Sequence, residues 1–324
     1  MVGASKRESY QLFALRRAVI DSTILTPVHP TAERLPSRMK LSVIIVNYKS
    51  RETLLECLAS LEADAAGIET EIVVVDNDSR DGTPEALAER SPAVRVVANA
   101  ENAGYARAVN QGIAATTGDF VLAMNPDCVV RPGALRALIG HLDAQPRCAI
   151  AAPRILNPDG SLEYSARSFP DPFAFLFNRY SLLTRLFPGN PWSRRYLLTD
   201  WDHASLRDVD WVSGACLMAR REAIGRVGGM DETFFMFNED VDWCRRMKLA
   251  GWSVTYVPSA EVVHNVGASR RRVAPRVIVE RHRGMIHYFH KYYPANPLVS
   301  FIADALIMAR AGLMLGVNAL RWPR

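Results

Sequence analysis

Long apolar runs alternate with helical apolar spacing between residues 41 and 124. The run LSVIIVNY at 41–48 is almost entirely apolar, which is typical of a strand covered on both faces. Behind it, four apolar residues recur three and four positions apart and predict one face of a helix: Leu54, Leu58, Leu61 and Ala65. Further strands are predicted at 71–75, 94–98 and 119–124, and further helices from Thr83, where Pro84 follows, and from about Tyr105.

Strands that alternate with helices predict an α/β fold with a mostly parallel, Rossmann-like sheet flanked by helices. In such a sheet the carboxyl ends of the strands meet at one edge, where ligands bind. We therefore examine the polar segments that follow the predicted strands: NYKS at 47–50, DNDSRDGT at 76–83, NAENAGYARAVNQG at 99–112 and NPD at 125–127.

These segments contain carboxylates and amides but neither G-x-G-x-x-G nor a P-loop, which excludes the common dinucleotide and NTP motifs. Asp76 can accept a hydrogen bond from a pyrimidine imide or from ribose hydroxyls. Asp127 can coordinate a divalent cation through oxygen. Each aspartate alone is also explained as a turn or capping residue. Their recurrence at successive strand ends favours a ligand site.

A second acidic motif is FFMFNEDVDWCRR at 234–246, in which three carboxylates follow four apolar residues. Asn238 is at a plausible helix N-cap, and negative charge is favourable in the first turn. Capping explains one acidic residue better than three. Asp242 can pair with Arg245 or Arg246, and crowding of like charges can raise the pKa of a neighbouring carboxyl toward that of a useful base.

The net charge of +5 is unevenly divided along the chain. Residues 1–40 hold seven Lys and Arg against three Asp and Glu, residues 41–270 hold 23 against 29, and residues 271–324 hold nine against two. The basic residues therefore accompany the flanks and not the body. This distribution favours an anionic membrane surface over nucleic acid as the partner.

The run at 297–320 is apolar over about the length of a membrane span but includes Asp304 and Arg310. On a helix, Ser300, Asp304 and Asn318 form a narrow polar stripe. This pattern favours a helix that lies in the membrane interface, and packing on the protein's own core is the alternative. Five separated cysteines without C-x-x-C spacing favour a reducing cytoplasm.

The ordered motifs VIIVNYKS, VVVDNDSRDGT, NAGYARAVNQG, MNPD and FFMFNEDVDWCRR resemble those of glycosyltransferase family 2 enzymes with the GT-A fold, particularly bacterial rhamnosyltransferases. The resemblance covers about residues 40–268. It implies a GT-A domain at 39–268. The basic residues and prolines before this domain predict an extension and linker at 1–38, and the basic and apolar residues after it predict a helical segment at 269–324. Within the domain, 39–130 would form the nucleotide-sugar half and 131–268 the acceptor half.

The resemblance also implies roles for individual residues. Asp240 would be the catalytic base, with Glu239 as the alternative. A divalent cation, Mg²⁺ or Mn²⁺, would be held by Asp127 and His264, although Asn125-Pro126-Asp127 replaces the usual D-x-D and leaves one carboxylate. Trp211 and Gly214 would face the acceptor, with a core role as the alternative for Trp211. The donor would contact Asn47, Asp76, Asn77, Asn102, Gly104, Arg107, Asn110 and Asn125.

These features predict an inverting glycosyltransferase at the cytoplasmic face of the cell membrane. Its donor would be a nucleotide sugar, with dTDP-L-rhamnose first and another UDP- or GDP-sugar as the alternative. Its acceptor would be a polyprenyl-diphosphate-linked or other cell-envelope glycan. A sugar nucleotidyltransferase is disfavoured because NYKSRET, after the first strand, contains no glycine. A non-catalytic nucleotide-sugar-binding protein is disfavoured by the presence of Asp76, Asp127 and Asp240 together.

Overall fold

The structure is a computed structural model that describes residues 39–171, 186–187, 190–265 and 274–321. Residues Arg38–Arg324 form one compact unit. The predicted extension and linker at 1–38, and residues 269–273 at the start of the predicted C-terminal segment, lie outside the described residues.

The first half of the unit alternates strands and helices as predicted. The strands β3, β2, β1 and β4 are adjacent in this order and all parallel. Their register places Asn47 opposite Asp76 at the carboxyl edge. The elements are β1 (Lys40–Asn47), α2 (Arg51–Asp64), β2 (Glu69–Asp76), α3 (Thr83–Arg90), β3 (Arg95–Ala98), α4 (Tyr105–Ala114) and β4 (Phe120–Met124).

The second half extends the same sheet with strands of both directions. Strand β10 pairs antiparallel with β4 and with β6, whereas β6 and β11 are parallel. Strands β5 and β8 pair antiparallel with β11, and β7 and β9 form a separate two-stranded sheet. The elements are β5 (Cys128–Val130), α5 (Ala134–Ala144), β6 (Cys148–Leu156), β7 (Ala166–Arg167), α8 (Pro191–Leu197), β8 (Arg207–Asp208), β9 (Trp211–Val212), β10 (Cys216–Arg220), α9 (Arg221–Val227), α10 (Glu239–Leu249) and β11 (Ser253–His264).

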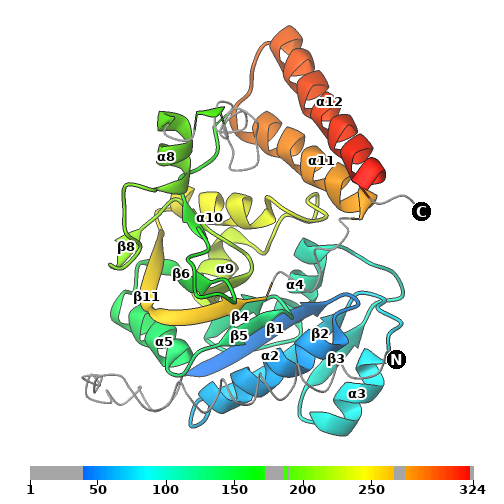
Figure 1. Cartoon of the computed structure of the whole chain (residues 1–324). Helices are drawn as coiled ribbons and strands as arrows, with labels where there is room; N and C mark the ends of the chain where they lie inside the picture. The colour runs from blue at the N-terminus through cyan, green and yellow to red at the C-terminus, as the bar shows by residue number, and fades with distance from the viewer. Residues whose placement is uncertain (1–38, 172–185, 188–189, 266–273, 322–324) are drawn as a thin grey trace, which may run out of the picture. The chain divides into compact units, whose positions relative to one another are not determined.

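Helices cover both faces of the sheet: α2 and α5 lie on one side, and α4 and α10 on the other (Figure 1). The apolar side chains of β1, and Val73 to Val75 of β2, are buried because both faces are covered. Helix α4 approaches β1 so closely that a Cβ on Gly112 would overlap the side chain of Ile44. Glycine at this position therefore allows the helix to pack on the strand.

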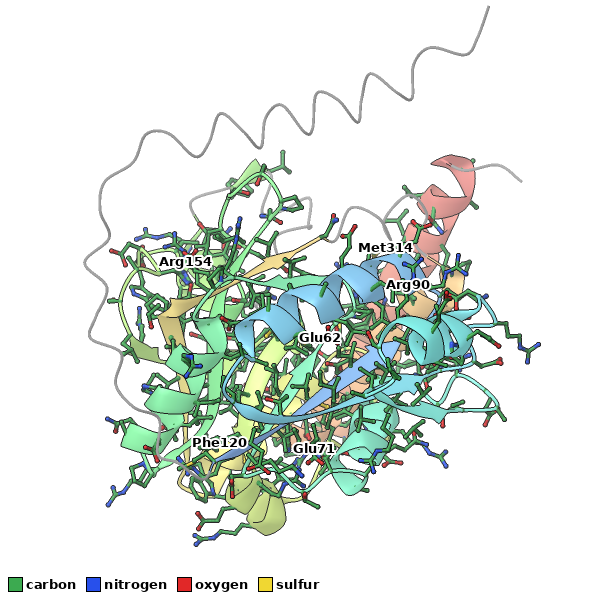
Figure 2. The ribbon with its side chains drawn as sticks, turned by 90° about the horizontal axis from the view of Figure 1, so that it is seen from below. Glu62, Glu71, Arg90, Phe120, Arg154 and Met314 are labelled. Carbon is green, nitrogen blue, oxygen red and sulfur yellow. The ribbon has the colours of Figure 1, made fainter. Side chains whose placement is uncertain are left out.

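The amino ends of the strands carry a polar cluster that is separate from the ligand edge. Glu71 and Phe120 mark this end of β2 and β4 in Figure 2. The Glu71 carboxylate accepts hydrogen bonds from Lys40 Nζ at 2.9 Å, Ser42 Oγ at 2.7 Å and the Thr117 N–H at 2.6 Å. Burial opposes ionisation of Glu71, but these hydrogen bonds outweigh it and lower its pKa to about 2. The hydrogen bonds of Glu71 stabilise this end of the sheet, and none of the predicted site residues takes part in them.

Two C-terminal helices complete the unit, α11 (Pro275–Tyr292) and α12 (Pro297–Arg321). Helix α11 is joined to α10 through the buried Asp242, which accepts from Lys291 Nζ and from the Tyr292 hydroxyl, each at 2.7 Å. Helix α12 packs on α11, and His290 Nε2 lies 3.0 Å from Asp304 Oδ2. Both helices lie beyond α10 in Figure 1.

The polar stripe of α12 faces the protein and the apolar face is exposed. Half-buried or buried side chains recur at helical spacing on one face, at Ser300, Asp304, Ile307, Ala311, Met314 and Asn318. The opposite face exposes Phe301 and Leu313 at 70% each. Within the described residues, one helix, Pro297–Leu320, is long and apolar enough to cross a membrane, and only 11% of its most apolar window is buried.

Candidate active site

The carboxyl ends of β1 and β2 place Asn47 and Asp76 in one buried network. Asp76 Oδ1 accepts from Asn47 Nδ2 at 2.8 Å and from Ser79 Oγ at 2.5 Å, and Asp76 Oδ2 accepts from the Ser79 N–H at 3.1 Å. Asn47 Nδ2 also lies 3.2 Å from the Thr83 hydroxyl at the start of α3. Several donors therefore fix the Asp76 carboxylate, so that it is oriented before a ligand arrives.

A cavity of about 390 Å³ opens beside Asp76. Its other lining residues come from the loop after β2, from the start of α3 and from the end of β3: Asp78, Arg80, Gly82, Pro84, Glu85 and Asn99. Asn99 Nδ2 donates to Asn77 Oδ1 at 2.8 Å, and Asn77 Nδ2 donates to the Gly104 carbonyl at 3.1 Å. The cavity thus lies at the predicted edge: Asp76 lines it, and Asn77 and Gly104 are joined to its lining residue Asn99 by these hydrogen bonds.

Three other predicted donor ligands make contacts within the protein. Asn102 Oδ1 accepts from the Gly104 N–H at 3.0 Å. Asn110 exchanges hydrogen bonds with the backbone of Met230, each at 2.8 Å. Arg107 Nε lies 3.9 Å from Glu232 Oε2 in an exposed pair. These contacts give each residue a structural role, and their contact with a donor stays a prediction.

Asp127 and His264 lie together at the end of β4 and β11. His264 Nε2 is 3.2 Å from Asp127 Oδ1 and 3.5 Å from Asn125 Nδ2. Cys128 brings a third ligand-type atom within 4.8 Å of this pair. Its thiol donates to the Ala215 carbonyl at 3.2 Å, and burial raises its pKa well above the ordinary range, so it remains a thiol. One carboxylate, one imidazole and a neighbouring amide are a set that Mg²⁺ or Mn²⁺ can use.

His264 is held from its other side as well. Its Nδ1 lies 3.0 Å from Glu163 Oε2. Burial disfavours the charged imidazolium, but hydrogen bonds to Asp127 and Glu163 outweigh burial and raise the pKa of His264 to about 9. Because a coordinating imidazole nitrogen carries no proton, a cation bound here has to displace one.

Asp240 and Glu239 occupy the first turn of α10, as predicted. Asp240 Oδ2 accepts from the Gly214 N–H and Asp240 Oδ1 from the Val241 N–H, each at 2.8 Å. Glu239 is buried, and its Oε2 has no hydrogen-bond partner among the described residues. Burial raises the pKa of both carboxyls, and the charge of Asp240 raises that of Glu239 further. The backbone donors therefore favour the anion on Asp240, whereas the surroundings of Glu239 favour its protonated form.

The segment before α10 connects the acidic motif to the nucleotide half. Phe237 and Asn238 have φ values of 67° and 71°, which turn the chain sharply into the helix. The Tyr105 N–H donates to the Phe235 carbonyl at 2.7 Å, and a Cβ on Gly104, whose φ is 87°, would overlap that carbonyl. Asn238 is the N-cap as predicted, but its side chain makes no capping hydrogen bond.

The predicted acceptor residues differ in their surroundings. The Gly214 backbone contacts Asp240, as described above, and its carbonyl accepts from the Tyr105 hydroxyl at 2.7 Å. Trp211 is buried, donates from Nε1 to the Ser168 carbonyl at 2.8 Å and has the Arg167 guanidinium 5.0 Å from its ring centroid. These contacts favour the core role for Trp211, and stacking on an acceptor stays a prediction.

Sequence reasoning missed Glu163, Tyr105 and Ser79, although all three contact predicted site residues. Ser79 lies within a quoted motif, and its spacing of three from Asp76 is a signal for a turn that could have found it. Tyr105 and Glu163 contact residues 109 and 101 positions away. No local pattern indicates such contacts.

Comparison with known proteins identifies the class of enzyme. Residues 42–227, more than half of the chain, match the family model described as Glycosyl transferase family 2. The N-acetylglucosaminyl-diphospho-decaprenol L-rhamnosyltransferase of Mycobacterium tuberculosis H37Rv is 37% identical over 254 residues, which cover 75% of this chain and 81% of the relative. The hexosyltransferase Agl10 of low-salt glycan biosynthesis in Haloferax volcanii is 28% identical over 72% of this chain and 69% of its own length.

Solved structures show the same fold. The mannosyltransferase PcManGT of Pyrobaculum calidifontis, in complex with GDP-Man and Mn²⁺, has a TM-score of 0.55 and 18% identity over 96% of this chain and 87% of its own. GalNAc-T7 with UDP, GalNAc and Mn²⁺ has a TM-score of 0.56 and 17% identity over 82% of this chain and 53% of its own. The chain belongs to glycosyltransferase family 2 and has the GT-A fold. It is a glycosyltransferase similar to the rhamnosyltransferases of that family.

Proposed function

We propose that the protein transfers L-rhamnose from dTDP-L-rhamnose to a polyprenyl-diphosphate-linked N-acetylglucosamine acceptor, with inversion at the anomeric carbon. The observation that carries the proposal is the similarity to the mycobacterial L-rhamnosyltransferase over three quarters of the chain, at 37% identity. The alternative donors are other UDP- or GDP-sugars, and Mn²⁺ and GDP-Man in a structural relative keep this alternative open.

The arrangement of carboxylates supports direct displacement. Asp240, whose anion is favoured by the Gly214 N–H, can accept the proton of the acceptor hydroxyl as that oxygen attacks the anomeric carbon. The C1–O bond to the nucleoside diphosphate breaks in the same step. One base and one displacement leave no covalent intermediate, so the product is inverted. The nucleotidyltransferase and non-catalytic alternatives do not need a base at this position.

The metal-side residues fit a cation-assisted departure of the diphosphate. Asp127 and His264 would hold Mg²⁺ or Mn²⁺, with Asn125 beside them. When bound, the cation would stabilise the charge that develops on the leaving diphosphate. Asp127 supplies one carboxylate where D-x-D would supply two, so we expect a modest metal affinity in the absence of the nucleotide.

The same proposal places the enzyme at the cytoplasmic face of a membrane, held peripherally by α12. A lipid-linked acceptor is held in a membrane, and α12 turns its polar stripe toward the protein and its apolar face outward. This arrangement is opposite to that of a soluble surface helix, which exposes its polar face. The excess of basic residues after position 270 suits an anionic surface, and five free, buried cysteines suit a reducing compartment.

The decisive experiment is a transfer assay with a synthetic polyprenyl-diphospho-N-acetylglucosamine acceptor and a panel of dTDP-, UDP- and GDP-sugars, with and without Mn²⁺. We expect rhamnosylation from dTDP-L-rhamnose, loss of the rate with a chelator, and an inverted product by NMR. Selective use of another sugar would replace the donor, and a retained configuration would contradict the mechanism. Release of a nucleoside triphosphate in the presence of pyrophosphate would favour the nucleotidyltransferase.

A further inference from the structure

A carboxylate outside the predicted ligand set contacts the metal-side histidine. His264, the last residue of β11, has Asp127 on one ring nitrogen and Glu163 on the other, at 3.2 Å and 3.0 Å. The side chains of His264 and Glu163 are only 9% and 14% exposed. The imidazole is therefore fixed between two carboxylates in a largely dry environment.

This arrangement determines which nitrogen can bind a cation. In a neutral imidazole one nitrogen carries the proton and the other carries the lone pair. A proton on Nδ1, donated to Glu163, leaves the lone pair on Nε2, which faces Asp127. Without a charged acceptor at Nδ1, the ring would be free to adopt the other tautomer or to rotate.

Neighbouring strands hold Glu163 in place. The Glu163 N–H donates to the Ile155 carbonyl of β6 at 2.9 Å, after a turn that returns the chain to this strand. Strand β6 pairs in parallel with β11, and Ile155 is opposite Val262, two residues before His264. Backbone pairing thus places Glu163 beside His264, and its largely buried carboxylate makes the contact.

We propose that Glu163 is a positioning residue for the divalent cation: it fixes His264 with the Nε2 lone pair directed to the position shared with Asp127. The inference rests on the proposed metal-assisted transfer. Carboxylates in this role commonly change metal affinity by 10- to 100-fold when they are removed. The same segment continues to Ser165, whose carbonyl accepts from the Ser213 N–H at 2.9 Å beside Gly214. It therefore links the metal side to the acceptor side.

The test measures Mn²⁺ affinity by the EPR signal of free Mn²⁺, on the full chain with and without dTDP and without a sugar donor. We expect about 10- to 100-fold weaker binding in Glu163→Ala. Glu163→Gln should lose less affinity, because its amide oxygen can still accept from Nδ1. Asp159→Asn is the matched control, since Asp159 lies in the same turn but accepts from Ser161; its affinity should equal that of the wild type.

Wild-type Mn²⁺ affinity in a folded Glu163→Ala protein would overturn the inference. If that variant does not fold, Glu163→Gln decides, and an affinity equal to that of Asp159→Asn would overturn the inference as well. Absence of Mn²⁺ binding by the wild type, even with dTDP, would also overturn it. Tight Mn²⁺ binding that depends on Glu163, in a protein that transfers no rhamnose, would sustain the inference and reject the proposed donor.

Discussion

At the scale of single residues, the two carboxyls at the start of α10 differ in what surrounds them. Asp240 receives two backbone N–H groups, whereas Glu239 Oε2 is buried without a partner among the described residues. Like charges on neighbouring buried carboxyls oppose each other's ionisation, so the anion that receives the backbone N–H groups is favoured. This difference between the two carboxyls supports the proposed assignment of Asp240 as the base.

The first prediction separates these two residues. Asp240→Asn should lower kcat by about 10²–10⁴-fold, because it removes the proton acceptor and keeps the shape. Glu239→Gln should retain most of the activity, since glutamine resembles the protonated acid. Steady-state kinetics, with dTDP binding as the folding control, provide the measurement. Equal losses in the two variants would contradict this assignment.

A second prediction concerns pH. Burial raises the pKa of Asp240, so its protonated form accumulates at a higher pH than that of an exposed aspartate. A protonated Asp240 cannot accept the hydroxyl proton. Therefore kcat/KM should fall as the pH is lowered through this raised pKa. Above this pKa, the titration of Asp240 should no longer change kcat/KM. A pH–rate profile measured at saturating Mn²⁺ checks this. A profile with its acid limb at or below the ordinary pKa of aspartate would argue against Asp240 as the base.

Much of the site could be predicted at the residue scale because its members follow buried strands. Asp76 and Asp127 are indicated by their position directly after apolar runs, and parallel pairing then brings them to one edge. The partner of His264 could not be found in this way. Glu163 reaches it through a turn and the pairing of β6 with β11, and this pairing has no local signature.

At the scale of elements, α10 contacts α11 through the buried carboxylate of Asp242. Asp242 accepts from Arg246 Nε at 2.8 Å, as the i+4 spacing predicts, and also from Lys291 and Tyr292 of α11. Arg245, the other predicted partner, donates instead to the Tyr288 hydroxyl at 2.8 Å. The helix that carries Asp240 is therefore anchored by its inner face to α11.

The third prediction follows from this anchor. Asp242→Ala should lower the free energy of unfolding by about 3–5 kcal/mol, because Arg246 and the Tyr292 hydroxyl lose their buried partner, while Lys291 retains Asp231. Asp200→Ala is the control, since Asp200 pairs with Arg194 at the surface and should change the free energy by less than about 1 kcal/mol. Urea unfolding measures both. A loss below about 1 kcal/mol in Asp242→Ala would show that the anchor contributes little.

The elements of the first half were predictable, whereas in the second half the start of α10 was predicted but the short strands were not. Strands β1 to β4 are continuous apolar runs, and the predicted starts of α3 at Thr83 and α4 at Tyr105 are confirmed. In the second half, β10 enters the sheet antiparallel between β4 and β6, and β5, β7, β8 and β9 are two or three residues long. Strands this short give no usable periodicity, and their direction is decided by the tertiary structure.

At the scale of the whole molecule, α12 has a fixed orientation relative to α11. Its polar stripe faces the protein, where Asp304 pairs with His290 of α11. Packing on the protein and an exposed apolar face are therefore both present, and the two alternatives drawn from the sequence are not exclusive. The exposed face is available to lipid, whereas a soluble helix would leave it in water at an energetic cost.

The fourth prediction tests this face. Phe301→Glu combined with Leu313→Glu should abolish flotation with anionic vesicles and leave binding of dTDP unchanged, because neither residue contacts the site. Leu249→Glu is the matched control: Leu249 is 73% exposed at the end of α10 and should not affect flotation. Flotation by the double variant at the wild-type level would reject the membrane role of α12.

The close contact of Gly284 has a consequence for chimeric enzymes. A Cβ at this position of α11 would lie 3.1 Å from the Phe237 carbonyl and 3.0 Å from Asn238 Nδ2. The turn before Asp240 and helix α11, which packs against α12, are therefore in close contact. The C-terminal helices could be exchanged between family members to alter membrane preference. We expect activity to be preserved only when residues 234–238 are exchanged with them, because this turn and α11 have to fit each other.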